Sequence, residues 1–190
     1  MVNLPSASPL VGREHELGAL ITLSGVARPP ESGLVLLAGD AGIGKSRLIE
    51  ALTARATDQG WRVAVGHCVD LGGSPVPYLP FSEIASRLQA NRPEVMRQLA
   101  SRWPGVGRLL PAVPGPAGRQ TDGPEPGDRG GFFESLHAML VELGSEAPLL
   151  LVIEDLHWAD QSTLDLLSYL FTRRFVAPVS IVASYRSDDL

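Results

Sequence analysis

The residues best suited to chemistry lie in one stretch, GDAGIGKS, from Gly39 to Ser46. It fits the pattern G-x-x-x-x-G-K-[ST], in which the backbone N–H groups of a glycine-rich loop surround phosphate oxygens. Lys45 would contact the β- and γ-phosphates of a nucleoside triphosphate, and the Ser46 hydroxyl would hold Mg²⁺. Lys45 is also the only lysine in the chain. The alternative interpretation is a glycine-rich turn between a core strand and a helix.

The segments on either side of this stretch are those that a phosphate loop requires. The apolar run Leu34 to Ala38 predicts a buried strand, and Leu48, Ala51 and Leu52 then lie on one face of a helical pattern. A helix that begins directly after the loop adds the partial positive charge of its N-terminus. The order of strand, loop and helix therefore supports phosphate binding.

A second pair of candidate residues, Glu154 and Asp155, ends the apolar run that begins at Leu149. An unbroken apolar run is typical of a strand covered on both faces, as in a parallel sheet. A magnesium–triphosphate complex needs an acid near the metal, and hydrolysis needs a carboxylate that orients water. If the strand continues through both acids, their side chains point to opposite faces and should have separate roles. The alternative is a pair of surface acids at a strand end.

Composition limits the class of protein. A chain of 190 residues suits one domain, and the net charge of −5 argues against a basic face that grips nucleic acid. Cys68 is the only cysteine, which excludes a disulfide framework and a cysteine zinc site. The N-terminus does not match a signal peptide, and no apolar run approaches the roughly 20 residues of a membrane span. We therefore expect a cytoplasmic protein without a membrane partner.

The remaining pattern predicts alternating strands and helices. The expected elements are a loose leader over 1–9, a helix within 10–23, a strand over 61–69, helices over 81–90 and 94–102, a Gly/Pro-rich loop over 104–131, a helix over 132–143, a helix over 163–174 with Ser162 and Asp165 as its capping box, and a strand over 179–184. Such alternation predicts an α/β fold with a doubly wound parallel sheet between helices. The phosphate loop, the two acids and Arg186 each follow a strand, so they should meet at one crevice.

Four motifs in this order, LVGREHEL, GDAGIGKS, LLLVIEDLHWAD and VSIVASYRSDDL, resemble the signal-transduction ATPases with numerous domains, a branch of the AAA-like P-loop NTPases. The likeness is greatest to the ATPase domain of large LuxR-type transcriptional regulators, and it runs from Leu10 to Leu190. It implies a sheet ordered 5-1-4-3-2 whose fifth strand lies beyond this chain. It also implies ATP and ADP with Mg²⁺ as ligands, self-association controlled by nucleotide, and DNA contact only through a domain absent from this chain.

The resemblance further implies roles for single residues. Glu154 and Ser46 take the metal positions, Asp155 the position of the catalytic acid, and Arg186 that of the arginine that senses the γ-phosphate. The metal position is more often aspartate, so Glu154 must fit an extra methylene. The implied nucleotide-binding residues are Gly39, Asp40, Ala41, Gly42, Ile43, Gly44, Lys45, Ser46 and Arg47, with Val11, Gly12 and Arg13 at the adenine end.

Three further groups of residues allow both a chemical and a structural interpretation, and the structural one is preferred for each. In the HWAD signature, Trp158 is expected to pack and Asp160 to cap the next helix, and no chemistry is assigned to His157. The group His67, Cys68 and Asp70 is expected to be structural rather than metal-binding. Arg173 and Arg174 are expected to interact with a helix dipole rather than to act as an arginine finger in trans.

The leading functional hypothesis is an ATP-dependent regulatory switch, with slow hydrolysis by this piece alone. One alternative is an ATPase that acts on nucleic acid, and another is a nucleotide-binding interaction module without turnover.

Overall fold

The computed structural model describes residues 12–70, 72, 76–109 and 129–187. The leader over 1–9, Val11 and most of the Gly/Pro-rich stretch lie outside the described residues, so the expectations for them stay predictions.

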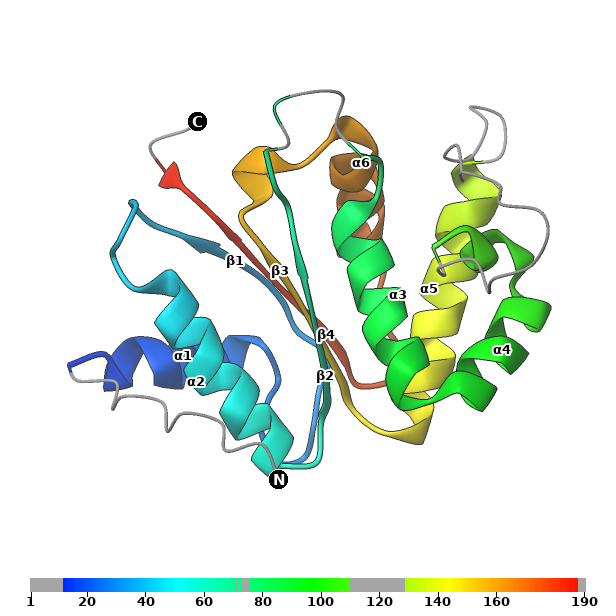
Figure 1. The fold of residues 1–190 in the computed structure, drawn as a ribbon. Helices are drawn as coiled ribbons and strands as arrows, with labels where there is room; N and C mark the ends of the chain where they lie inside the picture. Colours follow the sequence, from blue (N-terminus) through cyan, green and yellow to red (C-terminus); the bar gives the residue numbers. More distant parts are fainter. Residues whose placement is uncertain (1–11, 71, 73–75, 110–128, 188–190) are drawn as a thin grey trace.

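Four parallel strands form one sheet in the order β1-β4-β3-β2 (Figure 1). The strands are β1 (Leu34–Ala38), β2 (Arg62–His67), β3 (Leu149–Glu154) and β4 (Val179–Tyr185). Leu151 at the centre of β3 is in register with Ala64 of β2 and Ile181 of β4. The parallel α/β class is thereby confirmed, and the strand order agrees with the 1-4-3-2 part of the expected order. Among the described residues β1 pairs with β4 alone, which makes it an edge strand.

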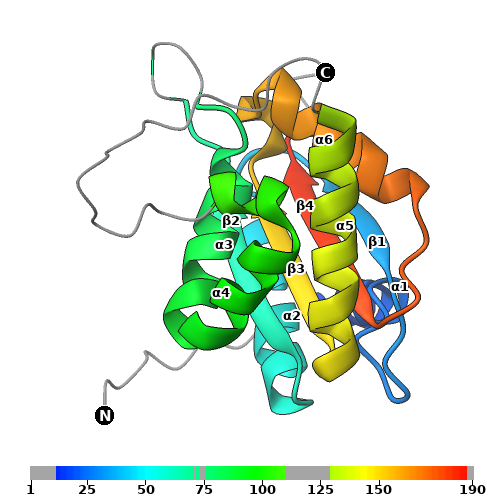
Figure 2. The same cartoon turned by 90° about the vertical axis from the view of Figure 1, so that its right-hand side faces the viewer.

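Helices cover both faces of this sheet (Figures 1 and 2). One face carries α1 (Glu14–Leu23) and α2 (Lys45–Asp58), and the other carries α3 (Leu79–Asn91), α4 (Pro93–Arg102), α5 (Arg129–Glu146) and α6 (Gln161–Thr172). In β3, Leu150 and Val152 join the core of the first face, while Leu149, Leu151 and Ile153 join that of the second. This alternation explains the unbroken apolar run of β3, since both of its faces are buried. No helix in the described part of the chain is long and apolar enough to cross a membrane.

The described residues at the two ends of the predicted loop over 104–131 are largely helical. Pro104–Arg108 forms a short 3-10 helix, η1, and α5 already begins at Arg129. Proline is compatible with a first helical turn because its missing N–H has no partner there in any case. Phe132 and Phe133 of α5 are buried, and such packing supplies most of the stability of a helix in a protein. The prediction at both ends of the loop was therefore wrong.

The predicted capping box of α6 was also wrong. Asp160 is the N-cap, and its carboxylate accepts the backbone N–H of Thr163 at 3.0 Å and the Thr163 hydroxyl. The helix begins at Gln161, two residues earlier than predicted, so Ser162 lies inside it. Capping by Asp160, the structural interpretation of that residue in the HWAD signature, is confirmed.

Candidate nucleotide and metal site

The loop from Gly39 to Gly44 connects β1 to α2 at the carboxyl edge of the sheet. Gly44 is the N-cap of α2 with φ 98°, a left-handed conformation that residues with a Cβ rarely adopt. The chain can therefore turn directly from the loop into the helix. The N-terminus of α2, with its partial positive charge and free N–H groups, then lies at this edge, as an anion site requires.

Lys45 lies over this loop. Its Nζ donates to the carbonyl oxygens of Gly39 at 2.5 Å and Asp40 at 2.9 Å. Both acceptors are neutral, so no carboxylate among these partners offsets the positive charge of the ammonium. The only lysine of the chain thus places a full positive charge beside the N-terminus of α2.

Ser46 and Glu154 meet although they lie 108 residues apart in the sequence. The Ser46 hydroxyl donates to Glu154 Oε2 at 3.0 Å, which joins the first turn of α2 to the last residue of β3. The glutamate therefore reaches the serine despite its extra methylene. Hydroxyl and carboxylate oxygens are hard ligands of the kind that Mg²⁺ prefers. The pair fits a magnesium ion chemically.

Asp155 lies in a turn that follows β3, so its orientation relative to Glu154 is set by this turn and not by the alternation of side chains along a strand. Strand β3 ends at Glu154, and Asp155 has φ 61° and ψ 46° in the left-handed region. The premise that the strand continues through both acids was therefore wrong. Aspartate is among the residues that tolerate this region, although such a conformation costs about 1–3 kcal/mol. The Asp155 N–H donates to Ser184 Oγ of β4 at 3.3 Å, which holds the turn against the neighbouring strand.

The end of β4 contacts the phosphate loop through Ser187, which the sequence patterns did not single out. Ser187 Oγ donates to Asp40 Oδ1 at 3.0 Å, and its backbone N–H donates to the Gly39 carbonyl at 3.4 Å. Arg186, the preceding residue, therefore lies at the same edge as the loop, as expected from strand order. Its contact with a γ-phosphate stays a prediction.

The N-terminus of α1 also approaches the loop. Arg13 donates to the Ile43 carbonyl at 3.2 Å and forms an ion pair with Glu16 at 3.1 Å. An apolar groove of about 300 Å³ lies beside this contact, between α1 and the outer edge of β1, and includes Leu20 and Leu36. Contact of Gly12 and Arg13 with an adenine stays a prediction.

The group His67, Cys68 and Asp70 does not form a metal site of its own. Within the described part of the chain, no three or more His, Cys, Asp or Glu side chains are arranged to hold a metal ion. Burial, with help from the nearby charges of Asp160, Asp155 and Glu83, raises the pKa of the Cys68 thiol to about 12. The thiolate that would bind a metal is therefore disfavoured. Asp70 accepts the N–H of Gly72 at 2.9 Å, a local turn contact.

His67 itself has partners that the sequence did not reveal. Its Nδ1 lies 3.0 Å from Glu83 Oε2, and its Nε2 lies 4.0 Å from Glu154 Oε1. The only available signal was its place near the end of the predicted strand over 61–69, because Glu83 belongs to a different element.

The other two ambiguous groups have structural surroundings. The Trp158 ring lies 5.1 Å from that of His157 and is 44% exposed, so it packs less than expected. Arg173 lies over the ring of Tyr169 at 4.8 Å, at the amino end of β4. That end of the sheet is opposite the phosphate loop, so the two arginines do not reach the site of their own chain.

The phosphate loop, Glu154 and Asp155 at the end of β3, and the residues that follow β4 lie together at one edge of the sheet, the arrangement of a P-loop ATPase fold. A family model described as an AAA ATPase domain matches residues 9–182. The chain belongs to this family. Members of the AAA ATPase family bind ATP or ADP with Mg²⁺, in keeping with the Lys45, Ser46 and Glu154 arrangement.

Two known proteins are similar to this AAA ATPase domain. It is 25% identical over 194 residues to an uncharacterised protein of Rhizobium meliloti (strain 1021), covering 94% of this chain and 18% of the relative. The crystal structure of Cdc6p from Pyrobaculum aerophilum shares the fold, with a TM-score of 0.50 and 17% identity, over 98% of this chain and 41% of that one. The chain therefore spans less than half the length of both proteins.

Proposed function

We propose that this AAA ATPase domain binds Mg·ATP and Mg·ADP and acts as a regulatory switch within a larger signal-transduction protein. The observation that carries the binding is the hydrogen bond between Ser46 and Glu154. It joins a hydroxyl and a carboxylate, two oxygen ligands for Mg²⁺, directly beside the loop that carries Lys45.

Each residue has a role in this proposal. Lys45 and the loop N–H groups bind the β- and γ-phosphates, while Ser46 and Glu154 hold the metal. Asp155 orients the attacking water, and Arg186 senses the γ-phosphate. The adenine end lies towards Gly12 and Arg13, where α1 contacts the phosphate loop.

The switch role is supported by the surroundings of the site. The loop is contacted by Ser187, which follows β4, and by Arg13, at the start of α1. Phosphate bound in the loop would therefore alter the contacts that the loop makes with the end of β4 and with the start of α1. In a larger regulator this coupling would control self-association, and a separate domain would contact DNA.

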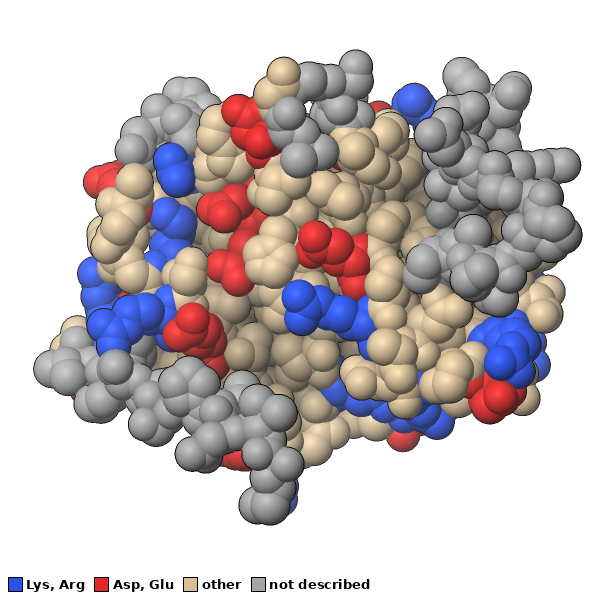
Figure 3. All heavy atoms as spheres, in the orientation of Figure 1, with Lys and Arg blue, Asp and Glu red and all other residues tan. Residues whose placement is uncertain are grey.

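The charge distribution favours a switch over an ATPase that itself grips nucleic acid. The chain carries a net charge of −5, and positive and negative side chains are interspersed over the face seen in Figure 3. Affinity for a nucleic acid backbone depends on concentrated basic side chains, which this face does not offer.

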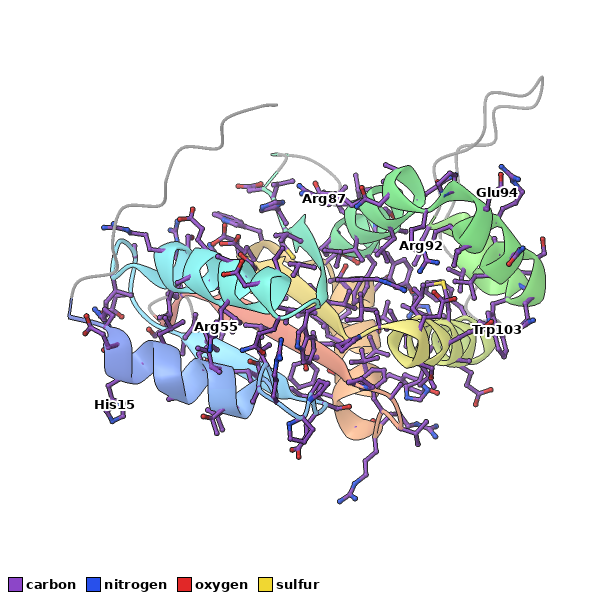
Figure 4. The ribbon with its side chains drawn as sticks, turned by 90° about the horizontal axis from the view of Figure 1, so that it is seen from below. His15, Arg55, Arg87, Arg92, Glu94 and Trp103 are labelled. Carbon is purple, nitrogen blue, oxygen red and sulfur yellow. The ribbon has the colours of Figure 1, made fainter. Side chains whose placement is uncertain are left out.

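Isothermal titration of ADP with and without Mg²⁺ tests the site. We expect Ser46→Ala and Glu154→Gln to weaken the magnesium-dependent part of the affinity about ten- to a hundredfold, since each removes a metal ligand or its charge. Binding in excess EDTA should not change. The matched control is Glu94→Gln, an exposed acid on α4 remote from the phosphate loop (Figure 4). Unaltered magnesium dependence in both site variants would contradict the proposal.

A further inference from the structure

His67 and Glu154 lie side by side at the carboxyl edge of the sheet. They are register partners at the ends of β2 and β3, so their side chains leave neighbouring parallel strands at the same level. His67 Nε2 and Glu154 Oε1 are 4.0 Å apart. The other oxygen of Glu154, Oε2, accepts the hydrogen bond from Ser46. The imidazole is therefore next to the residues that fit a metal ion.

Glu83 of α3 fixes the orientation of this imidazole. Glu83 Oε2 accepts the backbone N–H of His67 at 2.9 Å and lies 3.0 Å from Nδ1. An ionised carboxylate can only accept hydrogen bonds, so Nδ1 carries the proton in this pair. In a neutral imidazole the second nitrogen, Nε2, is then an acceptor. With a neutral imidazole, the pair of Glu83 and His67 therefore presents a lone pair towards Glu154.

Gly66 explains how Glu83 comes so close to β2. A Cβ at Gly66 would lie 2.1 Å from the carbonyl oxygen of Pro80 in the first turn of α3. The backbone of α3 therefore passes directly over the end of β2, and any side chain at this position would displace the helix. Glu83 is three residues further along α3, on the same side as Pro80, and so faces His67.

The space between His67 and Glu154 suits a water that donates to both. A separation of 4.0 Å is too long for a direct hydrogen bond. The Nε2 of a neutral imidazole and a carboxylate oxygen are both acceptors, so they repel unless a donor lies between them. With hydrogen bonds of about 2.8 Å, one water can donate a hydrogen to each acceptor. A water bound to a divalent cation has this donor-only character, because its oxygen faces the metal. Mg²⁺ in particular keeps several of its waters in protein sites.

We propose that His67, held by Glu83, is a positioning residue that accepts a hydrogen bond from a water of the hydrated divalent cation at Ser46 and Glu154. The inference rests on the proposed function, since it requires a metal–nucleotide complex at this edge. It needs no direct bond from the imidazole to the metal. Groups of this kind orient the ligands of a metal, and their loss typically lowers metal affinity about 10- to 100-fold.

Two substitutions of His67 separate its two nitrogens. In His67→Asn the amide nitrogen takes the place of Nδ1 and can still donate to Glu83, but nothing replaces Nε2. In His67→Gln the amide reaches the place of Nε2, where its oxygen can accept. The matched control is His15→Asn, because His15 is exposed and points away from α1 into solvent (Figure 4).

The experiment compares the dissociation constants of Mn²⁺·ADP with those of ADP in excess EDTA, by calorimetry on the full chain. We expect His67→Asn to lose about tenfold in Mn²⁺-dependent affinity, His67→Gln to lose less, and His15→Asn to match the wild type. The three variants should bind metal-free ADP alike. Electron spin echo spectra of bound Mn²⁺ should show no nitrogen of His67 bonded directly to the metal.

Three outcomes would overturn this inference. If His67→Asn keeps wild-type Mn²⁺ affinity while Glu154→Gln loses it, His67 is structural and the metal site stands. Equal losses with and without metal, together with a lower unfolding temperature, would also show a structural role. A directly bonded imidazole nitrogen would replace the bridging water with a metal ligand. If instead Glu154→Gln and Ser46→Ala keep their metal dependence, the proposed function itself fails.

Discussion

The two strands that lead into the site, β1 and β3, are supported very differently. Strand β3 pairs on both sides, and its first five residues are buried. Strand β1 pairs with β4 alone among the described residues, and none of its residues is buried. Leu151 of β3 has no exposed surface, whereas Leu36 of β1 is 56% exposed. The carboxylates therefore follow a central, buried strand, whereas the phosphate loop follows an edge strand.

Because of this difference, the two halves of the site, Glu154 and the phosphate loop, are held in position by different interactions. Glu154 is positioned by apolar packing of the strand that carries it. The phosphate loop is instead positioned by polar contacts, from Lys45 to the Gly39 and Asp40 carbonyls, from Arg13 to Ile43 and from Ser187 to Asp40. Polar contacts can be exchanged for phosphate oxygens without loss of the core. We therefore expect the loop to be the half of the site that responds to nucleotide.

The largest effect is expected at the end of β3, where Asp155→Asn should lower ATP hydrolysis about 10²- to 10⁴-fold while Mg·ATP binding is nearly unchanged. Asparagine also tolerates the left-handed backbone of this residue, so the turn should persist. Single-turnover hydrolysis and calorimetry measure the two quantities. If Asp155→Asn abolished the magnesium dependence of binding and Glu154→Gln did not, the roles of the two acids would be reversed.

The contributions of β3 and β1 to the stability of the fold can be compared by replacing one leucine in each strand with alanine. We expect Leu151→Ala to lower the free energy of unfolding by about 2–5 kcal/mol, because it leaves a cavity in a filled core. Leu36→Ala should change it by about 0.5 kcal/mol or less, since that side chain already contacts solvent. Urea denaturation measures both values. A similar loss in the two variants would show that β1 is covered in solution.

Removal of the ammonium from the phosphate loop tests the edge half of the site. Lys45→Ala should weaken ATP binding by about 1.5–3 kcal/mol, or roughly ten- to a hundredfold, because a charged hydrogen-bond donor is lost. Arg55→Ala is the control, a cation in the last turn of the same helix. Equal affinities of the wild type and Lys45→Ala in calorimetry would exclude this role for Lys45.

The smallest effect concerns association through β1. An unpaired apolar edge invites pairing with another chain, and Leu36, Leu23 and Ile43 are 56%, 64% and 46% exposed beside it. Leu36→Glu should therefore reduce the self-association of the wild-type chain in light scattering, since an edge charge opposes pairing. A wild-type chain that is already a uniform monomer would contradict this prediction.

Features that depend on consecutive residues could be predicted from the sequence alone. The loop GDAGIGKS, the strand before it and the helix after it are local patterns, and the structure has all three in the predicted order. The unbroken apolar run of β3 likewise predicted a strand covered on both faces, which gave the parallel α/β class. Hydrophobic periodicity and turn chemistry act over a few residues, so they can be recognised without the fold.

Contacts between residues that are distant in the sequence depend on the tertiary fold and could not be predicted. Ser46 and Glu154, His67 and Glu83, and Ser187 and Asp40 come from separate elements, and strand register and helix packing bring them together. The left-handed turn at Asp155 was likewise not visible in the run of apolar residues that leads into it. A backbone conformation that costs energy in isolation persists because neighbouring strands hold it, and those strands come from other parts of the chain.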